Sequence, residues 1–261
     1  MSSFQDLFSL AGKTAVVTGG TRGIGQAMAL AFAEAGADVI LIQRDDTNKT
    51  TYDQIKQLGR QAFIHTADLA DPKSVKSVIA ELTKAGHDMH ILLNCAGVQK
   101  RHAPHQFPDE DWDFVLQVNL NTVWTLCRDF GAYLLSKPKP SKGSRGSIIN
   151  IASLLTFQGG INVPAYAASK GGVGQLSKAL SNQWIGEGIK VNCIAPGYID
   201  TDMNEALMKD QARQKSILER IPAGRWGKPE DFKGPAIFLA SEASGYVSGD
   251  CLLVDGGWMG R

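Results

Sequence analysis

The sequence predicts an α/β fold in which helices cover both faces of a mainly parallel, seven-stranded sheet. Short runs that are apolar throughout alternate with longer stretches whose apolar residues recur at helical spacing. Parallel strands that are buried on both faces have this character. A glycine-rich turn follows the first apolar run, as in doubly wound domains that bind ligands at a strand end. No segment of linker composition divides residues 1–261, so we expect a single Rossmann-type domain.

The expected strands are runs of mostly apolar residues bounded by turn signals. They lie at residues 13–19, 37–43, 61–66, 90–97, 146–153, 189–197 and 249–257. Helical spacing of apolar residues predicts the helices, at residues 23–36, 48–58, 71–86, 111–135 and 164–186. Pro72 supports the predicted start of the third helix. Proline lacks an N–H group, and the N–H groups of a first helical turn have no partner within the helix.

Composition narrows the classes of function. Hydrophobic residues make up 43% of the chain and charged residues 20%, which is ordinary for a globular protein. The formal net charge of +1 gives no electrostatic reason to expect a nucleic-acid or membrane-surface partner. The scattered cysteines and histidines follow no metal-ligand spacing, so no metal site is expected. Without a secretory signal or an apolar run near the ~20 residues of a membrane span, a cytoplasmic location is expected.

Residues 18–25, TGGTRGIG, form the glycine-rich turn between the first strand and the first helix. Glycines let the backbone turn tightly and approach a pyrophosphate, while the helix N-terminus offers free N–H groups and the positive end of its dipole. We therefore expect a dinucleotide at this turn. The expected contacts are Gly19, Thr21, Arg22, Gly23, Ile24 and Gly25. The alternative is a glycine-rich turn that binds no ligand.

The end of the second strand normally reads the 2′-position of the adenosine ribose. An acidic residue there bonds the ribose hydroxyl, and an arginine favours a 2′-phosphate. Gln43 occupies the position of the acid and Arg44 follows it, which favours NADP(H) over NAD(H). Asp45 and Asp46 come next and could neutralise Arg44. A solvated surface arginine is the alternative interpretation.

Tyr166 and Lys170 are four residues apart in a predicted helix, so their side chains leave the same face. A phenol titrates near pH ~10, and a neighbouring ammonium group lowers that pKa. The pair therefore suits the proton transfer of an alcohol–ketone interconversion. Ser153, predicted to end the fifth strand, can donate to a substrate carbonyl. Each residue also has an ordinary structural alternative, such as capping or packing.

These residues give the chain its resemblance to the short-chain dehydrogenase/reductase family. The resemblance covers essentially the whole chain and implies an NAD(P)-dependent oxidoreductase acting on CH–OH groups. The residues that carry it are TGGTRGIG, Asp68-Leu69, NCAG at 94–97, Asn119, Ser153, Tyr166-x-x-x-Lys170 and Pro196-Gly197 followed by Thr201.

The resemblance implies a role for each matching residue. Tyr166 is the general acid in reduction and the general base in oxidation, and Lys170 lowers its pKa and bonds the nicotinamide ribose. Ser153 polarises the carbonyl. Asn119 holds a water that relays protons, with Asn121 as a rival for that role. The implied cofactor contacts are Asp68 and Leu69 at the adenine, Asn94, Ala96 and Gly97 at the ribose, and Pro196, Gly197, Ile199 and Thr201 at the nicotinamide end.

Residues 147–173, 194–201 and the C-terminal region narrow the substrate. They resemble the branch of the family that acts on deoxy-sugar acids such as 2-deoxy-D-gluconate or 2-dehydro-3-deoxy-D-gluconate. A sugar acid needs a cation for its carboxylate. Lys100, Arg101 and His102 follow the fourth strand, on the side where open α/β sheets bind ligands. We expect Arg101 to meet the carboxylate; a solvated basic loop is the alternative.

Other functions stay open at this point. Within enzymes, the alternatives are a β-ketoacyl-carrier-protein reductase and a polyol dehydrogenase. From another class, a nucleotide-sensing regulator would keep the fold without turnover, but such a protein would usually lack Tyr166 or Lys170. The family resemblance further implies a substrate flap near residues 202–221. It also implies a homotetramer joined through the two long helices and the C-terminal strand.

Overall fold

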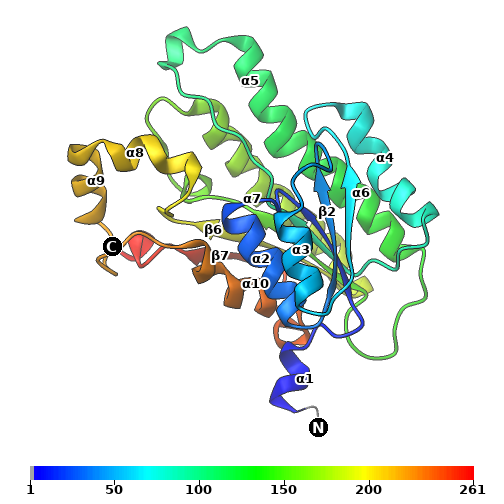
Figure 1. Ribbon diagram of the computed structural model, residues 1–261. Helices are drawn as coiled ribbons and strands as arrows, with labels where there is room; N and C mark the ends of the chain where they lie inside the picture. The colour runs from blue at the N-terminus through cyan, green and yellow to red at the C-terminus, as the bar shows by residue number, and fades with distance from the viewer. Residues whose placement is uncertain (1–2) are drawn as a thin grey trace.

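The computed structural model describes residues 3–261, with the backbone alone at position 206. One sheet runs through the molecule, and all of its neighbouring strands are parallel (Figure 1). The predicted α/β fold and seven-stranded sheet are confirmed. In spatial order the strands are β3 (Ala62–Thr66), β2 (Asp38–Gln43), β1 (Thr14–Thr18), β4 (Ile91–Asn94), β5 (Gly146–Ile151), β6 (Ile189–Pro196) and β7 (Cys251–Val254).

The central strands are apolar on both faces because helices cover both. In β1, Val16 lies in register with Ile40 of β2 and with Leu92 of β4. Val16 belongs to a hydrophobic cluster on one face of the sheet, whereas Val17 belongs to the cluster on the other face. Successive side chains of a strand point to opposite faces, so a continuous apolar run is what such a strand requires.

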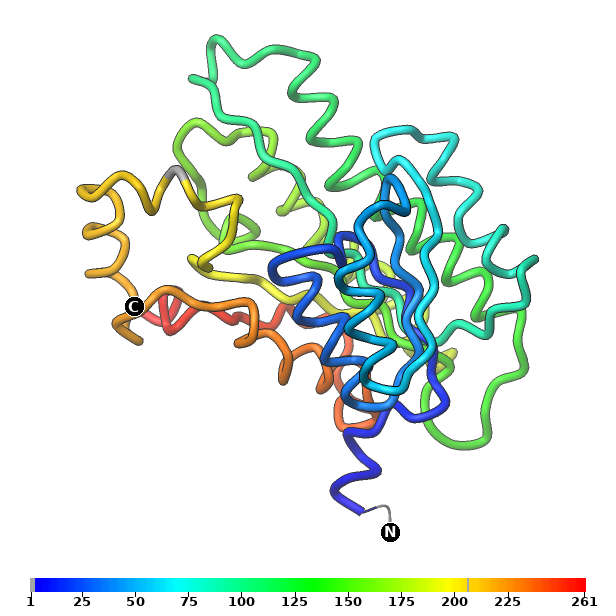
Figure 2. Tube along the Cα trace, in the orientation of Figure 1, coloured from blue at the N-terminus to red at the C-terminus, as the bar shows by residue number. Residues whose placement is uncertain are grey.

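Two layers of helices enclose the sheet (Figures 1 and 2). On one face, Phe32 of α2 and Phe232, just before α10, are fully buried in one cluster. On the other face, Phe130 of α6 is fully buried. The first layer comprises α2 (Gly23–Glu34), α3 (Thr50–Gln57) and α10 (Lys233–Ala240), and the second comprises α4 (Pro72–Lys84), α6 (Thr122–Leu135) and α7 (Pro164–Trp184).

Three features depart from the expected elements. A short helix, α1 (Phe4–Phe8), precedes the sheet, and α10 was not predicted. The predicted helix at 111–135 consists of α5 (Asp109–Leu116), a π-helical turn at Gln117–Asn121, and α6. The charged segment at residues 202–221 is helical, as its sequence predicts, and contains α8 (Glu205–Lys209) and α9 (Gln211–Leu218). None of the helices in the described part of the chain is both long and apolar enough to cross a membrane.

The strand order reverses direction at β1. Its successor β2 lies on one side, and β4 lies on the other. At the carboxyl end of β1, the Thr18 hydroxyl accepts hydrogen bonds from the N–H groups of Cys95 and Ala96, at 3.1 and 3.2 Å. It also contacts the carbonyl of Leu93 at 3.4 Å. The crevice of a doubly wound sheet opens at such a reversal. Thr18 holds the loop after β4 in place at the wall of this crevice.

Thr18→Val replaces the hydroxyl by a methyl group of similar size and leaves two backbone N–H groups without their acceptor. We expect the free energy of unfolding to fall by about 1–3 kcal/mol, the cost of unsatisfied buried donors. Denaturant titration measures the change. Thr14→Val in the same strand is the matched control, because the Thr14 hydroxyl makes no hydrogen bond within residues 3–261. Equal stability of the two variants would contradict the structural role of Thr18.

Candidate active site

A cavity of about 1580 Å³ extends along the carboxyl ends of the strands. It brings together the glycine-rich turn, the predicted serine, tyrosine and lysine, and the loop that carries Arg101. Nearly every residue predicted to bind cofactor or substrate lines it. The two that do not are Asn94 and Asn119. The other predicted residues in its wall are Gly19, Thr21, Arg22, Gly23, Ile24, Gly25, Arg44, Asp68, Leu69, Ala96, Gly97, Arg101, Ser153, Tyr166, Lys170, Pro196, Gly197, Ile199 and Thr201.

The glycine-rich turn has no room for side chains. Gly19 has a φ of +69°, and a Cβ there would lie 2.7 Å from the Ala96 backbone nitrogen. A Cβ on Gly25 would collide with the carbonyl oxygen of Gly19. Since the backbone is bare at these positions, a phosphate can approach the N–H groups at the start of α2. Arg22, at the N-cap of α2, pairs with Asp202 at 2.7 Å. Both side chains are exposed, so the pair is weak and displaceable.

The end of β2 provides both features expected of a ribose site. The amide nitrogen of Gln43 donates to the carbonyls of Asp45 and Asn48 at 2.7 and 3.0 Å. Its amide oxygen is buried in the cavity wall without a partner, as an acceptor for a ribose hydroxyl would be. The Asp45 carboxylate bonds to Thr47, and within residues 3–261 no acid forms a salt bridge with Arg44. The charge of Arg44 still contributes to lowering the pKa of the adjacent Asp45 carboxyl, so the two side chains interact without forming an ion pair.

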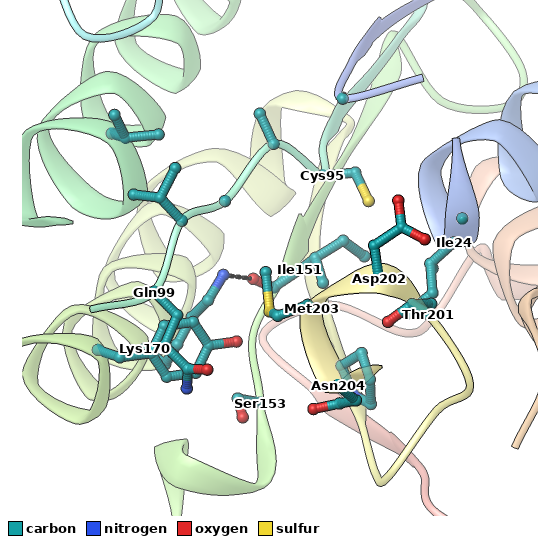
Figure 3. Close-up of a pocket in the computed structure, with 18 of the residues that line it drawn as sticks. Ile24, Cys95, Gln99, Ile151, Ser153, Lys170, Thr201, Asp202, Met203 and Asn204 are labelled. Atoms are coloured by element: carbon teal, nitrogen blue, oxygen red, sulfur yellow. Dashed lines mark hydrogen bonds between the residues drawn. The ribbon is translucent and has the colours of Figure 1, made fainter. Parts of the chain in front are cut away.

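Three functional groups converge at the centre of the cavity. Figure 3 shows Lys170, Ser153 and Gln99, which belongs to the loop after β4, on the same side of it. The Lys170 ammonium group donates to the Ile151 carbonyl at 2.6 Å and lies 5.6 Å from the centre of the Tyr166 ring. The predicted side chains therefore meet, as the four-residue spacing in α7 requires.

Ser153 was predicted to end the fifth strand, and the structure shows that it does not. Strand β5 stops at Ile151, and Ser153 is the N-cap of the 3₁₀ turn Leu154–Thr156. Its hydroxyl oxygen accepts from the Leu155 N–H at 3.2 Å. Because the backbone bond uses an oxygen lone pair, the hydroxyl proton stays available for donation to a carbonyl. Capping and catalysis are thus compatible for this residue.

Burial dominates the acid–base properties of Tyr166 and Lys170. Desolvation raises the pKa of Tyr166 to about 12, and hydrogen bonding with Ser153 opposes the rise. The lowered pKa expected from Lys170 is not found: the groups that lower the pKa of this phenol are Ser153 and Arg101, and desolvation outweighs both. Desolvation lowers the pKa of Lys170 itself to about 8. Tyr166 is therefore a neutral phenol near neutral pH, which is the form that donates a proton.

Asn119 supports the site from behind rather than lining it. It is fully buried in the π-helical turn, a feature that occurs often at functional sites. Its amide nitrogen donates to the Val98 carbonyl at 2.9 Å, and its amide oxygen accepts from the Val98 N–H at 2.9 Å. A second donation reaches Ser169 of α7 at 3.2 Å. Asn119 therefore ties the loop after β4 to the helix that carries Tyr166.

Asn94 also departs from its predicted role at the cofactor ribose. Its side chain is buried at the carboxyl end of β4 and donates to Asn150 of β5 at 2.9 Å. Asn150 in turn donates to Ser177 of α7 at 2.9 Å. These contacts instead give Asn94 a role in supporting the central sheet. The neighbouring Cys95 does line the cavity, where burial raises the pKa of its thiol to about 12, so it is not a thiolate nucleophile.

The basic loop after β4 presents one free cation to the cavity. Asp111 of α5 accepts from Lys100 at 2.9 Å and from His102 at 2.7 Å. These contacts lower the pKa of the Asp111 carboxyl. Arg101 is left without a salt bridge among the described residues, and a bond of 2.9 Å to Gln99 orients its guanidinium group. Of the three basic residues named by the sequence, Arg101 is the one available to an anion.

Several cavity residues were not singled out from the sequence. Tyr198 follows β6 and packs beside Trp226 and Trp258. Arg213 comes from α9, which the sequence showed only as part of a charged helical segment. No spacing signal identifies such residues, because they reach the cavity only through tertiary packing. Further ones are Ile42, Asn48, Gln99, Gln158, Met203, Asn204 and Met208.

The cavity residues fit a nicotinamide dinucleotide. The bare turn at Gly19 and Gly25 suits a pyrophosphate, and the unpartnered oxygen of Gln43 lies at the strand end that reads the ribose. Lys170 and Tyr166 line the same cavity and supply the groups that a reacting ring and a substrate carbonyl would need. The cavity is also wide enough to hold a small substrate beside the dinucleotide.

Comparison with known proteins places the chain among oxidoreductases. A family model described as enoyl-(acyl carrier protein) reductase matches residues 19–259. A 2-dehydro-3-deoxy-D-gluconate 5-dehydrogenase of Pseudoalteromonas atlantica is 50% identical over 97% of this chain and 98% of its own. One of the same name from Bacillus subtilis is 47% identical over the full length of both. A gluconate 5-dehydrogenase of Burkholderia cenocepacia, solved with NADP and tartrate, is 35% identical, covers 99% and 100% of the two chains, and superimposes with a TM-score of 0.92.

Gly25→Ala tests the glycine-rich turn. The new methyl group meets the Gly19 carbonyl, and the backbone must shift. We expect a loss of about 1–3 kcal/mol of stability from overpacking, together with at least ~10-fold weaker dinucleotide binding if the turn holds the pyrophosphate. Thermal unfolding and fluorescence titration with cofactor measure the two effects. Gly186→Ala is the control, because nothing lies within 4 Å of its added Cβ. Unchanged cofactor affinity in Gly25→Ala would count against the turn as a phosphate site.

Proposed function

Because this chain belongs to the short-chain dehydrogenase/reductase family, we propose that it interconverts a secondary alcohol and a ketone on a deoxy-sugar acid, using NADP(H). The substrate that fits best is 2-dehydro-3-deoxy-D-gluconate. One observation carries the proposal: the cavity holds Ser153, Tyr166 and Lys170 beside an unpaired arginine. Full-length similarity to 2-dehydro-3-deoxy-D-gluconate 5-dehydrogenases supports the same substrate class.

The chain's own residues account for proton transfer and orientation. The bound nicotinamide supplies or accepts the hydride. In reduction, Ser153 donates a hydrogen bond to the carbonyl oxygen and Tyr166 donates the proton that the new alkoxide takes up. In oxidation, Tyr166 accepts that proton. The ammonium group of Lys170, held 5.6 Å from the ring centre, favours the phenolate that forms transiently.

The substrate carboxylate is assigned to Arg101. Its guanidinium group lies close enough to Tyr166 for each to affect the pKa of the other. An anion bound to Arg101 therefore lies near the reacting carbon. A fork of donors suits a carboxylate, and the tartrate in the B. cenocepacia relative shows that such a protein can be obtained with a dicarboxylate.

Cofactor preference follows from the end of β2. Gln43 carries no charge that would repel a 2′-phosphate, and Arg44 is exposed and free of salt bridges within residues 3–261. These features favour NADP(H), and the B. cenocepacia relative was solved with NADP. NAD(H) remains the alternative cofactor, because the 2′-hydroxyl can also donate to Gln43.

A homotetramer and a cytoplasmic location complete the proposal. Large apolar side chains stand partly exposed on the elements expected to join subunits, Trp124 of α6 and Leu253 of β7. Burying such side chains against other copies of the chain would stabilise an assembly. The four cysteines are free thiols, as expected in a reducing compartment. Light scattering of the purified protein determines the number of subunits.

Tyr166→Phe removes the proton donor and acceptor while keeping the ring. We expect kcat/KM for 2-dehydro-3-deoxy-D-gluconate to fall by about 10²–10⁴. In the wild-type protein, the raised pKa of Tyr166 makes the phenolate scarce at neutral pH, so oxidation should accelerate as pH rises, whereas reduction should not need alkaline pH. Steady-state kinetics in both directions measure this. Tyr52→Phe, which changes a tyrosine outside the cavity, is the control. Retained turnover in Tyr166→Phe would refute the mechanism.

Arg44→Ala removes the guanidinium group proposed to bind the 2′-phosphate. We expect KM for NADPH to rise about 10- to 100-fold, corresponding to one lost charge-assisted contact, with little change in KM for NADH. Lys49→Ala serves as the control, since it removes a nearby exposed charge that does not line the cavity. If KM for NADH rises equally, the arginine does not read the 2′-position.

A further inference from the structure

A second arginine faces the same cavity as Arg101, from the flap. Arg213 lies in α9 and lines the cavity. It precedes Ile217 by four residues, so both leave the same face of the helix. Ile217 is buried against Leu154 and Trp258, which turns this face of α9 toward the wall beside Ser153. Figure 1 shows α8 and α9 standing to one side of the sheet, next to the C-terminus.

Neither arginine is neutralised by the protein. Within residues 3–261, no acid forms a salt bridge with Arg101 or Arg213. Asp111 is occupied by Lys100 and His102. Asp210 caps α9 by accepting from the backbone N–H of Arg213 at 3.1 Å. The fold thus brings two positive groups to one cavity and uses the neighbouring acids elsewhere.

Both arginines line one cavity, and the charge of Arg213 acts on Arg101 there. Partial desolvation and the nearby charge of Arg213 lower the pKa of Arg101, against the opposing influence of Tyr198 and Tyr166. Like charges held together without a counter-ion disfavour each other, and an anion placed between them removes that cost. The region near Tyr166 and Tyr198 is where the substrate, rather than the dinucleotide phosphates, would supply the negative charge.

We propose that Arg213 is a specificity-determining residue that binds the substrate carboxylate together with Arg101. The inference rests on the proposed sugar-acid function and adds a contact from α9 to it. Arg101 belongs to the loop fixed by Asn119 and Asp111, whereas Arg213 arrives with the flap. A carboxylate has two oxygens and can accept from one guanidinium group on each. Binding of the acid therefore also holds α9 against the cavity.

The test compares Arg213→Ala, Arg213→Lys and Arg101→Ala with Lys215→Ala. Lys215→Ala removes one positive charge from the same helix, at a position outside the cavity. Substrates are 2-dehydro-3-deoxy-D-gluconate and its uncharged primary amide. We expect Arg213→Ala to raise KM for the acid about 10- to 100-fold, the worth of a charge-assisted contact. Its kcat, its KM for NADPH and its kcat/KM for the amide should stay near those of Lys215→Ala, and Arg213→Lys should recover part of the loss.

Calorimetric binding of tartrate to the NADP-loaded protein provides a second readout that needs no turnover. We expect Arg213→Ala and Arg101→Ala each to weaken tartrate binding, and the double variant to lose less than the product of the two effects, because both contacts serve one anion. If Arg213→Ala matches Lys215→Ala in both assays, or raises KM for NADPH instead, the assignment of Arg213 is wrong. If the wild-type protein turns over no sugar acid yet binds tartrate through Arg213, the proposed function fails and the anion site stands.

Discussion

Every functional group in this protein depends on the reversal of strand order between β1 and β4. Parallel strands deliver all their carboxyl ends to one edge, and the reversal separates the loops there instead of stacking them. The Thr18 hydroxyl holds the loop after β4 at this point. The glycine-rich turn and the Ala96 backbone then approach so closely that no side chain fits at Gly19. From this fixed crevice the chain presents phosphate-binding groups on one side and proton-transfer groups on the other.

Hydrogen bonding behind the crevice makes the reacting groups rigid. Asn94, Asn150 and Ser177 link β4, β5 and α7 in a buried chain of polar contacts. Asn119 adds a link between the loop after β4 and α7. Buried polar groups are costly unless paired. Apart from the Asn94 amide oxygen, which has no partner among the described residues, these side chains are paired, and this favours one arrangement. Tyr166 and Lys170, on α7, take their positions from that arrangement.

The distribution of acids decides which cations remain free. Asp111 engages Lys100 and His102, Asp45 turns to Thr47, and Asp202 takes Arg22. The sequence placed Asp45 beside Arg44 and suggested neutralisation, but the local turn directs the carboxylate to Thr47. Neighbours in sequence therefore did not predict partners in space. Of the arginines left without salt bridges among the described residues, Arg44 after β2 and Arg101 after β4 line the cavity.

Elements whose signal is local were predictable from the sequence. Apolar runs identified all seven strands, and the motifs identified the glycine-rich turn, Ser153, Tyr166 and Lys170. Helix α10 was missed because KGPAIFLA contains a glycine and a proline, which the first turn of a helix tolerates. The π-helical turn was missed because the helical pattern continues through it. Arg213 has no motif, since only the packing of Ile217 on Leu154 and Trp258 turns its face inward.

Helix α9 packs separately from the elements that carry the proton-transfer groups. This separation bears on how such a protein changes over evolution. The proton-transfer groups lie on α7 and the sheet edge, within networks that tolerate little substitution. Helix α9 instead rests on a small satellite cluster around Ile217 and Trp258, apart from the two main cores. Residues of α9 other than the buried Ile217 can therefore be exchanged at small cost to folding. New substrate preferences can arise there while the same reaction continues unchanged, as expected when variable segments are mounted on a conserved scaffold.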